Sequence, residues 1–215
     1  MSTLPYNGLR WEFGAYQLGL DNIESRDSGV LIANDTFGRN YPFFADELRR
    51  FSALVLQARH SALATAVGSV EDKGCEFSLC NIGFRAWVRS NLFYLNGPAI
   101  QALDGRVFEP EIFQAPTASQ GRLRINLPAS PGFADYITAW MAPTPSKHNW
   151  LGHTGRSEAP DQVLRDKTGS ILLEKRMSSR LLAAGGALLR CNLPESAWHR
   201  LRLRVYLRLR RLRGS

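Results

Sequence analysis

Residues 7 to 36 read NGLRWEFGAYQLGLDNIESRDSGVLIANDT, and this stretch predicts the fold class. Residues 12–23 carry apolar side chains at helical spacing, at Phe13, Tyr16, Leu20 and Ile23. A continuous apolar run, Val30–Ala33, follows, as expected for a strand covered on both faces of a parallel sheet. The run ends at Asn34-Asp35-Thr36, and ligands of open α/β sheets bind at the carboxyl ends of strands. We therefore expect an α/β fold with a central buried strand at 30–33 and a polar site at the carboxyl end of that strand.

The rest of the chain predicts further helices and strands in alternation. Helices are expected at 41–60, 98–103, 133–141 and 161–184, the last one possibly broken near Gly169, and strands at 62–70, 87–95 and from residue 188. A loop is expected at 71–74, and six prolines between residues 106 and 155 indicate a loop-rich connection there. Gly185-Gly186 should end the long helix.

Composition favours one core-forming unit in a reducing compartment. The chain has 215 residues, 44% of them hydrophobic, which is enough for a single buried core. Three cysteines make no disulfide framework, and the first residues have no secretory apolar segment, so we expect a cytoplasmic setting. The sequence has no apolar run long enough to span a bilayer.

The net charge of +8 lies almost wholly in the last residues. Seven arginines occupy residues 200–213, and without them 20 basic residues face 19 acidic ones. The body is therefore nearly neutral, and the composition does not indicate a nucleic-acid-binding domain. We expect a globular unit over residues 1–195 and a basic tail over 196–215.

The tail alternates arginine with leucine or valine from Arg200 to Arg210, a period of two that fits a strand better than an amphipathic helix. Trp198 and Tyr206 nevertheless suit a membrane interface, and arginine stems can lie along apolar surface. Anionic lipid attracts such clusters by about 1 kcal/mol per basic residue. We expect Arg200–Arg213 to bind an anionic membrane surface, with acidic protein or RNA as the alternatives.

The Asn7-Gly8 turn, the FGAY segment at residues 13–16 and the strand ending Asn34-Asp35-Thr36 together resemble the rhamnan-synthesis and related polysaccharide glycosyltransferases. Those enzymes are relatives of the GT-A nucleotide-sugar transferases. The resemblance runs over residues 7–186 and is specific over 7–36 and 171–186. It implies a GT-A-like, mostly parallel sheet flanked by helices. It also implies transfer of a sugar from a nucleotide-sugar donor to a growing cell-surface polysaccharide or lipid-linked glycan.

The resemblance assigns donor binding to the ends of this first unit. The donor residues would be Asn7, Gly8, Arg10, Asn34, Asp35 and Thr36. Asp35 would also bind a divalent cation, Mg²⁺ or Mn²⁺, together with the donor diphosphate, since hard cations take carboxylate and phosphate oxygens. The alternatives are an Asx turn at Asn34-Asp35 and an ordinary tight turn at Asn7-Gly8.

Residues 171–186, ILLEKRMSSRLLAAGG, resemble the helix that carries the catalytic base of inverting GT-A enzymes. Glu174 matches the base, Arg180 and Gly185 match later positions, and Lys175 replaces a second acid of the pattern. The resemblance makes Glu174 the carboxylate that takes the acceptor proton. Alternatively, Glu174 is a helix-surface residue that pairs with Ser178 or with a nearby lysine.

The stretch at residues 87–95, WVRSNLFYL, resembles the strand that lines the acceptor side of these enzymes. Ser90 and Asn91 would contact an acceptor sugar, and Trp87 would stack on a pyranose face. Buried structural roles for Trp87, Phe93 and Tyr94 are the alternative, since aromatic side chains in strands usually belong to the core. The two histidines at 148 and 153 lack the spacing of a zinc hydrolase.

The chain starts at or after the strand and loop that bind the nucleotide base in that family, so the resemblance implies an N-terminally abbreviated relative. An active enzyme would work at the inner face of the membrane, as a peripheral cytoplasmic protein. The other two hypotheses are an inactive GT-A-like subunit that partners another transferase and a basic-tailed module that binds RNA or lipid.

Overall fold

A long antiparallel hairpin forms the centre of the fold in a computed structural model, which describes residues 11–23, 29–34, 43–142, 146, 149–154, 159–192, 202 and 206. Strand β2 (Thr65–Leu79) and strand β3 (Ile82–Leu95) are joined by Cys80 and Asn81, which have φ values of 50° and 62°. Two central residues with positive φ are typical of the tight turns that suit the twist of a hairpin. The hairpin replaces the expected loop at 71–74, where β2 continues.

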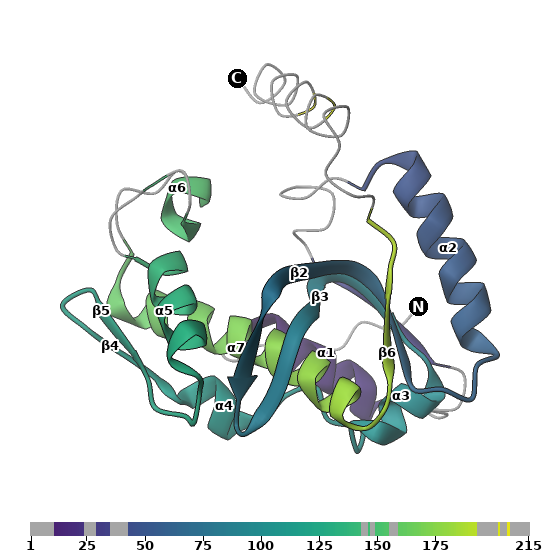
Figure 1. Cartoon of the computed structure of the whole chain (residues 1–215), viewed down its shortest axis with the longest axis horizontal. Coiled ribbons are helices and arrows are strands. Elements are labelled where there is room, and N and C mark those ends of the chain that lie inside the picture. Colours follow the sequence, from purple (N-terminus) through teal and green to yellow (C-terminus); the bar gives the residue numbers. More distant parts are fainter. Residues whose placement is uncertain are drawn as a thin grey trace.

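The main sheet has the order β1-β3-β2-β6 and is mostly antiparallel (Figure 1). Strand β1 (Val30–Ala33) pairs antiparallel with β3, and only β6 (Ala187–Arg190) runs parallel to its neighbour, β2. The prediction of a mostly parallel, GT-A-like sheet is therefore wrong. A two-residue connection allows only antiparallel pairing of the central strands, and a parallel pair would need a crossover between them.

Strand β1 has the predicted bounds but a different place in the sheet. It lies at an edge, with Ile32 6% exposed and Leu31 60% exposed. The prediction of a central strand covered on both faces is wrong, because a short apolar run does not by itself show how many faces are covered.

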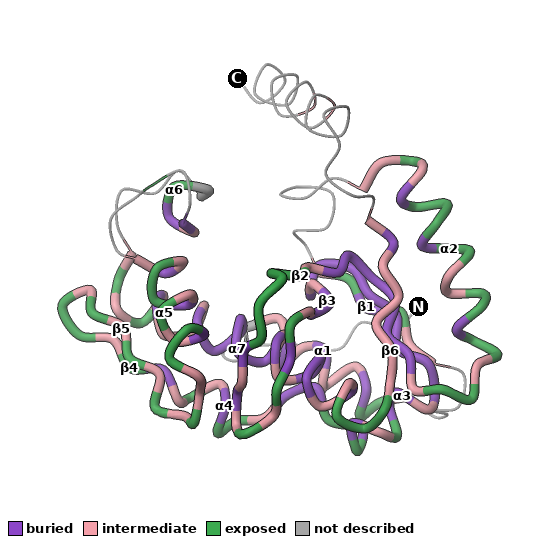
Figure 2. The backbone as a smooth tube through the Cα atoms, viewed as in Figure 1, coloured by how far each residue is buried: buried purple, intermediate pink, exposed green. Residues whose placement is uncertain are grey.

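Helices cover both faces of the sheet, as Figures 1 and 2 show. Helix α1 (Trp11–Asp21) and helix α7 (Asp161–Ala183) pack on one face, where Phe13, Trp87 and Leu172 belong to one large buried cluster. Helix α2 (Ala45–Arg59) covers the other face. A smaller buried cluster lies beneath it and contains Phe51, Ala58, Val67, Leu92, Tyr94 and Cys191.

Helix α7 continues through Gly169, where a break had been considered. A Cβ atom at Gly169 would lie 2.4 Å from the carbonyl oxygen of Phe113, at the end of helix α4 (Pro110–Gln114). The glycine therefore allows two segments to approach closely and does not end the helix. Gly185 and Gly186 follow the last turn, as predicted.

The remaining helices and strands lie between β3 and α7 in the sequence. Helix α3 (Gly97–Ala102) begins after Asn96, close to its predicted start. The region predicted to be loop-rich contains α4, strands β4 (Pro116–Ser119) and β5 (Arg122–Ile125), helix α5 (Pro131–Trp140) and helix α6 (Trp150–Thr154). Only α5 was expected there. None of the helices in the described ranges is long and apolar enough to cross a bilayer.

Candidate functional site

The central feature of the site is a bulge in β3. Gly68 pairs with Phe93, but the next pair along the hairpin is Val70 with Val88. One residue of β2 therefore faces residues 89–92 of β3, and none of these four pairs with β2, although Leu92 still pairs with Ala33 of β1. Bulges of this kind re-aim side chains and often lie beside active sites. The predicted acceptor residues, Ser90 and Asn91, both lie in the bulge.

Neighbouring elements bind the backbone groups that the bulge leaves unpaired. The Ser90 N–H donates to Glu174 Oε2 at 2.7 Å, and the Tyr16 hydroxyl donates to the Ser90 carbonyl oxygen at 2.8 Å. The Val88 N–H donates to Ser178 Oγ at 3.1 Å, and the Asn34 N–H donates to the Asn91 carbonyl oxygen at 3.2 Å. Buried backbone groups need such partners, so these contacts bind α1, α7 and the end of β1 to the bulge.

Glu12, in the first turn of α1, joins three of these segments. Its Oε1 atom accepts hydrogen bonds from Ser90 Oγ at 2.7 Å and from Ser170 Oγ at 3.1 Å. Its Oε2 atom accepts one from Asn34 Nδ2 at 2.8 Å. Glu12 carries no distinctive signal in the sequence, because an acid in the first turn of a helix is common for reasons of the helix dipole alone.

Glu174 is buried in an ion pair with the next residue of α7. Lys175 Nζ lies 2.5 Å from Glu174 Oε1, and the two side chains are 5% and 13% exposed respectively. Burial alone would raise the pKa of Glu174, but the Lys175 ammonium, the Ser90 N–H and Arg89 together hold it below its ordinary value. The carboxylate is therefore ionised at neutral pH, and each of its oxygens already has one partner.

The Trp87 ring packs against the Lys175 ammonium of this ion pair. The ring is fully buried, and Lys175 Nζ lies 4.2 Å from the ring centre. A buried ring cannot stack on a sugar, so the expected pyranose contact of Trp87 is wrong. Phe93 and Tyr94 are buried as well, which confirms the structural alternative for all three aromatic residues. Trp87 Nε1 donates no hydrogen bond to any residue in the described ranges.

A second group of charges lies beside the pair, on the hairpin and α5. Glu71 pairs with Arg89 at 3.2 Å and with Lys73 at 2.5 Å. Burial acts to raise the pKa of Glu71, but Arg89, Lys175 and Lys73 lower it below its ordinary value. Lys73 Nζ also lies 5.1 Å from the ring centre of Tyr136. Burial, Glu71 and Glu174 together raise the pKa of Tyr136, so its hydroxyl stays protonated.

Two polar atoms of this region have no hydrogen-bond partner among the residues that the structure describes. Asn91 Oδ1 is buried, and no described residue donates a hydrogen bond to it. The structure shows no hydrogen bond to the Tyr136 hydroxyl from any of the residues it describes, and this side chain is partly exposed. The Tyr136 hydroxyl both donates and accepts hydrogen bonds, and of the two atoms only this one lies on a partly exposed side chain.

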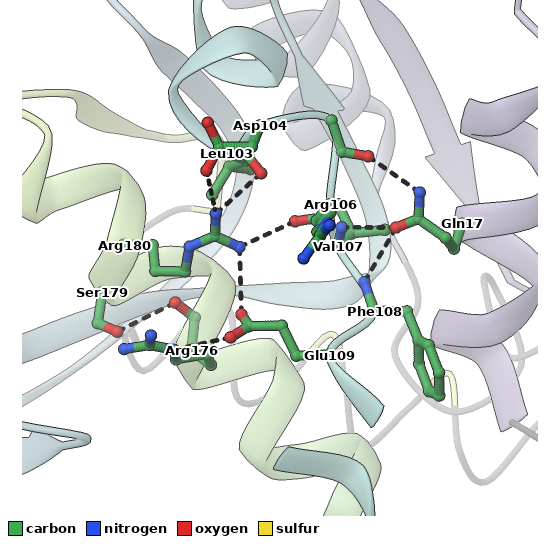
Figure 3. A network of polar contacts seen from close by, with 11 residues as sticks. Gln17, Leu103, Asp104, Arg106, Val107, Phe108, Glu109, Arg176, Ser179 and Arg180 are labelled. Atoms are coloured by element: carbon green, nitrogen blue, oxygen red, sulfur yellow. Dashed lines mark hydrogen bonds and ion pairs between the residues drawn. The ribbon is translucent and has the colours of Figure 1, made fainter. Parts of the chain in front are cut away.

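The other end of α7 carries a separate network, drawn in Figure 3. Arg180 lies 3.2 Å from Glu109 and from Asp104, and Arg176 Nε lies 3.3 Å from Glu109. Arg180 also donates to the carbonyl oxygens of Leu103 and Arg106. Arg180, which matches a position of the predicted motif, therefore holds the segment after α3 against α7. Its guanidinium has no contact with Glu174 in this network.

The structure brings together four of the predicted site residues: Asn34, Ser90, Asn91 and Glu174. The predicted donor and metal residues Asn7, Gly8, Arg10, Asp35 and Thr36 lie outside the residues that the structure describes. Within the described ranges, no group of three or more His, Cys, Asp or Glu side chains is arranged to hold a metal ion.

The sequence matches no family model, and comparisons with the curated proteins and with the solved structures found no significant match.

Proposed function

We propose that the chain transfers a sugar from a nucleotide-sugar donor to a growing cell-surface polysaccharide or lipid-linked glycan. One observation carries the proposal. Asn34, Ser90 and Glu174 come from three different elements, were singled out by a resemblance to such transferases, and are linked through hydrogen bonds at one bulge. The proposal does not depend on a GT-A sheet, because a function resides in its site and not in its fold.

In this proposal Glu174 takes the proton of the acceptor hydroxyl. As the acceptor oxygen forms its bond to the sugar, the bond to the nucleoside diphosphate breaks, and the diphosphate leaves with the electron pair. The Glu174 carboxylate must be ionised beforehand, and its lowered pKa meets that need. Each carboxylate oxygen keeps a second lone pair beside its partners Lys175 and Ser90.

The donor side of the proposal rests on residues near the start of α1 and after β1. Asn7, Gly8, Arg10, Asn34 and Thr36 would bind the donor, and Asp35 would hold Mg²⁺ or Mn²⁺ together with its diphosphate. Asn91 and Ser90 would contact the acceptor. The protein would act at the inner face of the membrane.

A second candidate is a subunit that binds a sugar or nucleotide and assists another transferase without transferring a sugar itself. The hydrogen bonds and the lowered pKa of Glu174 favour this assisting role. Both of its oxygens are engaged, and a lowered pKa makes a carboxylate a weaker base. Under this alternative, Glu174 serves to bind the bulge to α7.

Calorimetric titration of nucleoside diphosphates and nucleotide sugars, with and without Mg²⁺ or Mn²⁺, tests the donor site. We expect metal-dependent binding that Asp35→Asn weakens. A panel in which no nucleotide or nucleotide sugar binds under either condition would contradict the transferase.

A transfer assay then separates the two. The double variant Glu174→Gln/Lys175→Met removes the carboxylate and its counter-ion together, so no unpaired charge is left buried. If Glu174 is the base, this variant keeps nucleotide affinity while transfer slows by roughly 10²-fold or more. Glu111→Gln, at an exposed carboxylate on α4, is the matched control and should leave the rate unchanged. Nucleotide binding without any transfer by the wild-type protein would favour the assisting subunit.

A further inference from the structure

Exposed apolar side chains gather at helix α2. Among the residues that the structure describes, the large apolar side chains with high exposure are Leu31, Leu48, Leu56 and Leu63. Three of these four belong to α2 or to the turn that follows it, and Leu56 and Leu63 are 63% and 49% exposed. Scattered exposed leucines are ordinary, but three along one helix and its end mark a surface.

The same helix presents three exposed arginines. Arg49, Arg50 and Arg59 are exposed, and the structure shows no ion pair or hydrogen bond from any of these side chains within its described part. The two acids of α2 do not offset them. Glu47 is 1% exposed and accepts a hydrogen bond from the Phe44 N–H, and Asp46 is bound by an arginine of the tail.

The apolar and basic residues lie on one side of the helix. Leu48, Leu56 and Arg59 are exposed, and separations of eight and then three residues place them on neighbouring parts of the helix surface, with Leu56 farthest from the sheet. The opposite side carries Phe51 and Ala58, which are buried against the sheet. Figure 2 shows the alternation of buried and exposed stretches along α2. The helix therefore has a second amphipathic face, open to the outside.

Arg202 of the basic tail forms an ion pair with the first turn of the same helix. Arg202 donates to both carboxylate oxygens of Asp46, at 2.8 and 3.1 Å, and its guanidinium lies 4.1 Å from the ring centre of Phe44. Tyr206 meets the Phe44 ring edge to face, at 6.4 Å between ring centres. Arg202 therefore neutralises Asp46, the one acid of α2 that is not buried, and leaves the outward face of α2 purely basic.

We propose that the outward face of α2, defined by Leu48, Arg49, Leu56, Arg59 and Leu63, lies on an anionic lipid surface. Helices that lie in a membrane interface combine an apolar stripe with basic side chains, and these bind the headgroups. Exposed leucines distinguish this surface from a site for single-stranded nucleic acid, which stacks bases on aromatic side chains. The proposal stands independently of sugar transfer.

Vesicle sedimentation with the full chain tests this surface. The probes are vesicles of pure phosphatidylcholine and vesicles with about one-third phosphatidylglycerol. We expect binding only to the anionic vesicles, and binding should weaken as salt rises. Arg49→Gln/Arg59→Gln should weaken it roughly 25-fold, about fivefold per arginine. Leu56→Gln should weaken it by a further factor of about five, because its apolar surface no longer enters the interface.

Two matched controls separate the surface from the effects of net charge and of an exposed leucine elsewhere. Arg122→Gln/Arg124→Gln removes two exposed arginines from β5, and Leu31→Gln changes a leucine of similar exposure on β1. Both should keep wild-type binding. Circular dichroism and the melting temperature show that each variant is folded. The proposal is overturned if the α2 variants bind as the wild type does, if the β5 control loses as much as the α2 pair, or if the protein ignores anionic vesicles and binds only RNA.

Discussion

Replacing Glu174 with glutamine removes the charge that balances Lys175 inside the protein. Glu174 Oε1 lies 2.5 Å from Lys175 Nζ, and Oε2 accepts the Ser90 N–H at 2.7 Å. A glutamine side chain has one acceptor oxygen and one amino group that only donates. Whichever way the amide lies, its amino group faces either the Lys175 ammonium or the Ser90 N–H, so one buried donor loses its acceptor.

The burial of the pair sets the size of the effect. Lys175 is 5% exposed, and removing one partner of a buried ion pair costs about 3–5 kcal/mol because the remaining charge is left unpaired. For a chain of 215 residues, one kcal/mol corresponds to a change of about 2–4 °C in melting temperature. We therefore expect Glu174→Gln to lower the melting temperature by about 6–20 °C at pH 7.

The pH dependence has a defined sign. The pKa of Glu174 is lowered in the folded state, so its contribution to stability is complete above the ordinary value of 4.5. This contribution is lost as the pH falls through the lower, folded-state pKa. The difference in unfolding free energy between the wild type and Glu174→Gln should therefore be constant at neutral pH and should narrow in acid.

Urea unfolding followed by circular dichroism measures these differences. The double variant Glu174→Gln/Lys175→Met places an apolar side chain over Trp87 and should come within about 1 kcal/mol of the wild type, because replacing a buried ion pair as a unit is often neutral. Glu111→Gln should change stability by less than about 0.5 kcal/mol. A cost below about 1 kcal/mol for Glu174→Gln, or a double variant no more stable than the single one, would refute the argument.

Three further predictions concern the rest of the fold. Asn96→Ala should cost about 2–4 kcal/mol in urea unfolding, because this buried amide caps α3 and makes hydrogen bonds to five backbone groups. Arg202 lowers the pKa of Asp46 to about 2, so the stability that this ion pair contributes should be constant above about pH 4 and disappear towards pH 2. Asp46→Asn should abolish this part of the pH dependence of the melting temperature. Gly169→Ala should destabilise the protein, because its Cβ would lie 2.4 Å from the Phe113 carbonyl oxygen, whereas Gly19→Ala on α1 meets no atom within 4 Å and should stabilise it by about 0.4–1 kcal/mol. Equal melting temperatures for the two glycine variants would contradict the packing assigned to α7.

Local pattern was sufficient to predict most of the helices. The apolar spacing of α1, α2, α5 and α7 gave their positions to within a few residues, and the proline after Asn96-Gly97 indicated the start of α3. These signals are local, because a helix forms its hydrogen bonds within its own segment and faces the core with a regular period. Even β1 and β6 were predicted at their observed positions, although their neighbours were not.

The arrangement of the strands could not be predicted in the same way. An apolar run such as Val30–Ala33 has the same composition in a central parallel strand and at an antiparallel edge. The tight turn at Cys80-Asn81 was missed because Cys-Asn is not one of the dipeptides, such as Asn-Gly or Asp-Gly, that mark a hairpin; without it the hairpin was divided into separate segments. That one connection decides the direction of the whole central sheet.

For the candidate site as well, sequence and tertiary structure determined different features. The sequence, through its resemblance to a transferase family, selected Asn34, Ser90, Asn91 and Glu174 as candidate site residues. Only the tertiary structure decided that they meet at a bulge, that Glu12 links them and that Lys175 neutralises Glu174. The physical reason is that a hydrogen bond or an ion pair between distant segments depends on distances of about 3 Å, and these are set by how the helices pack on the sheet and not by any local pattern.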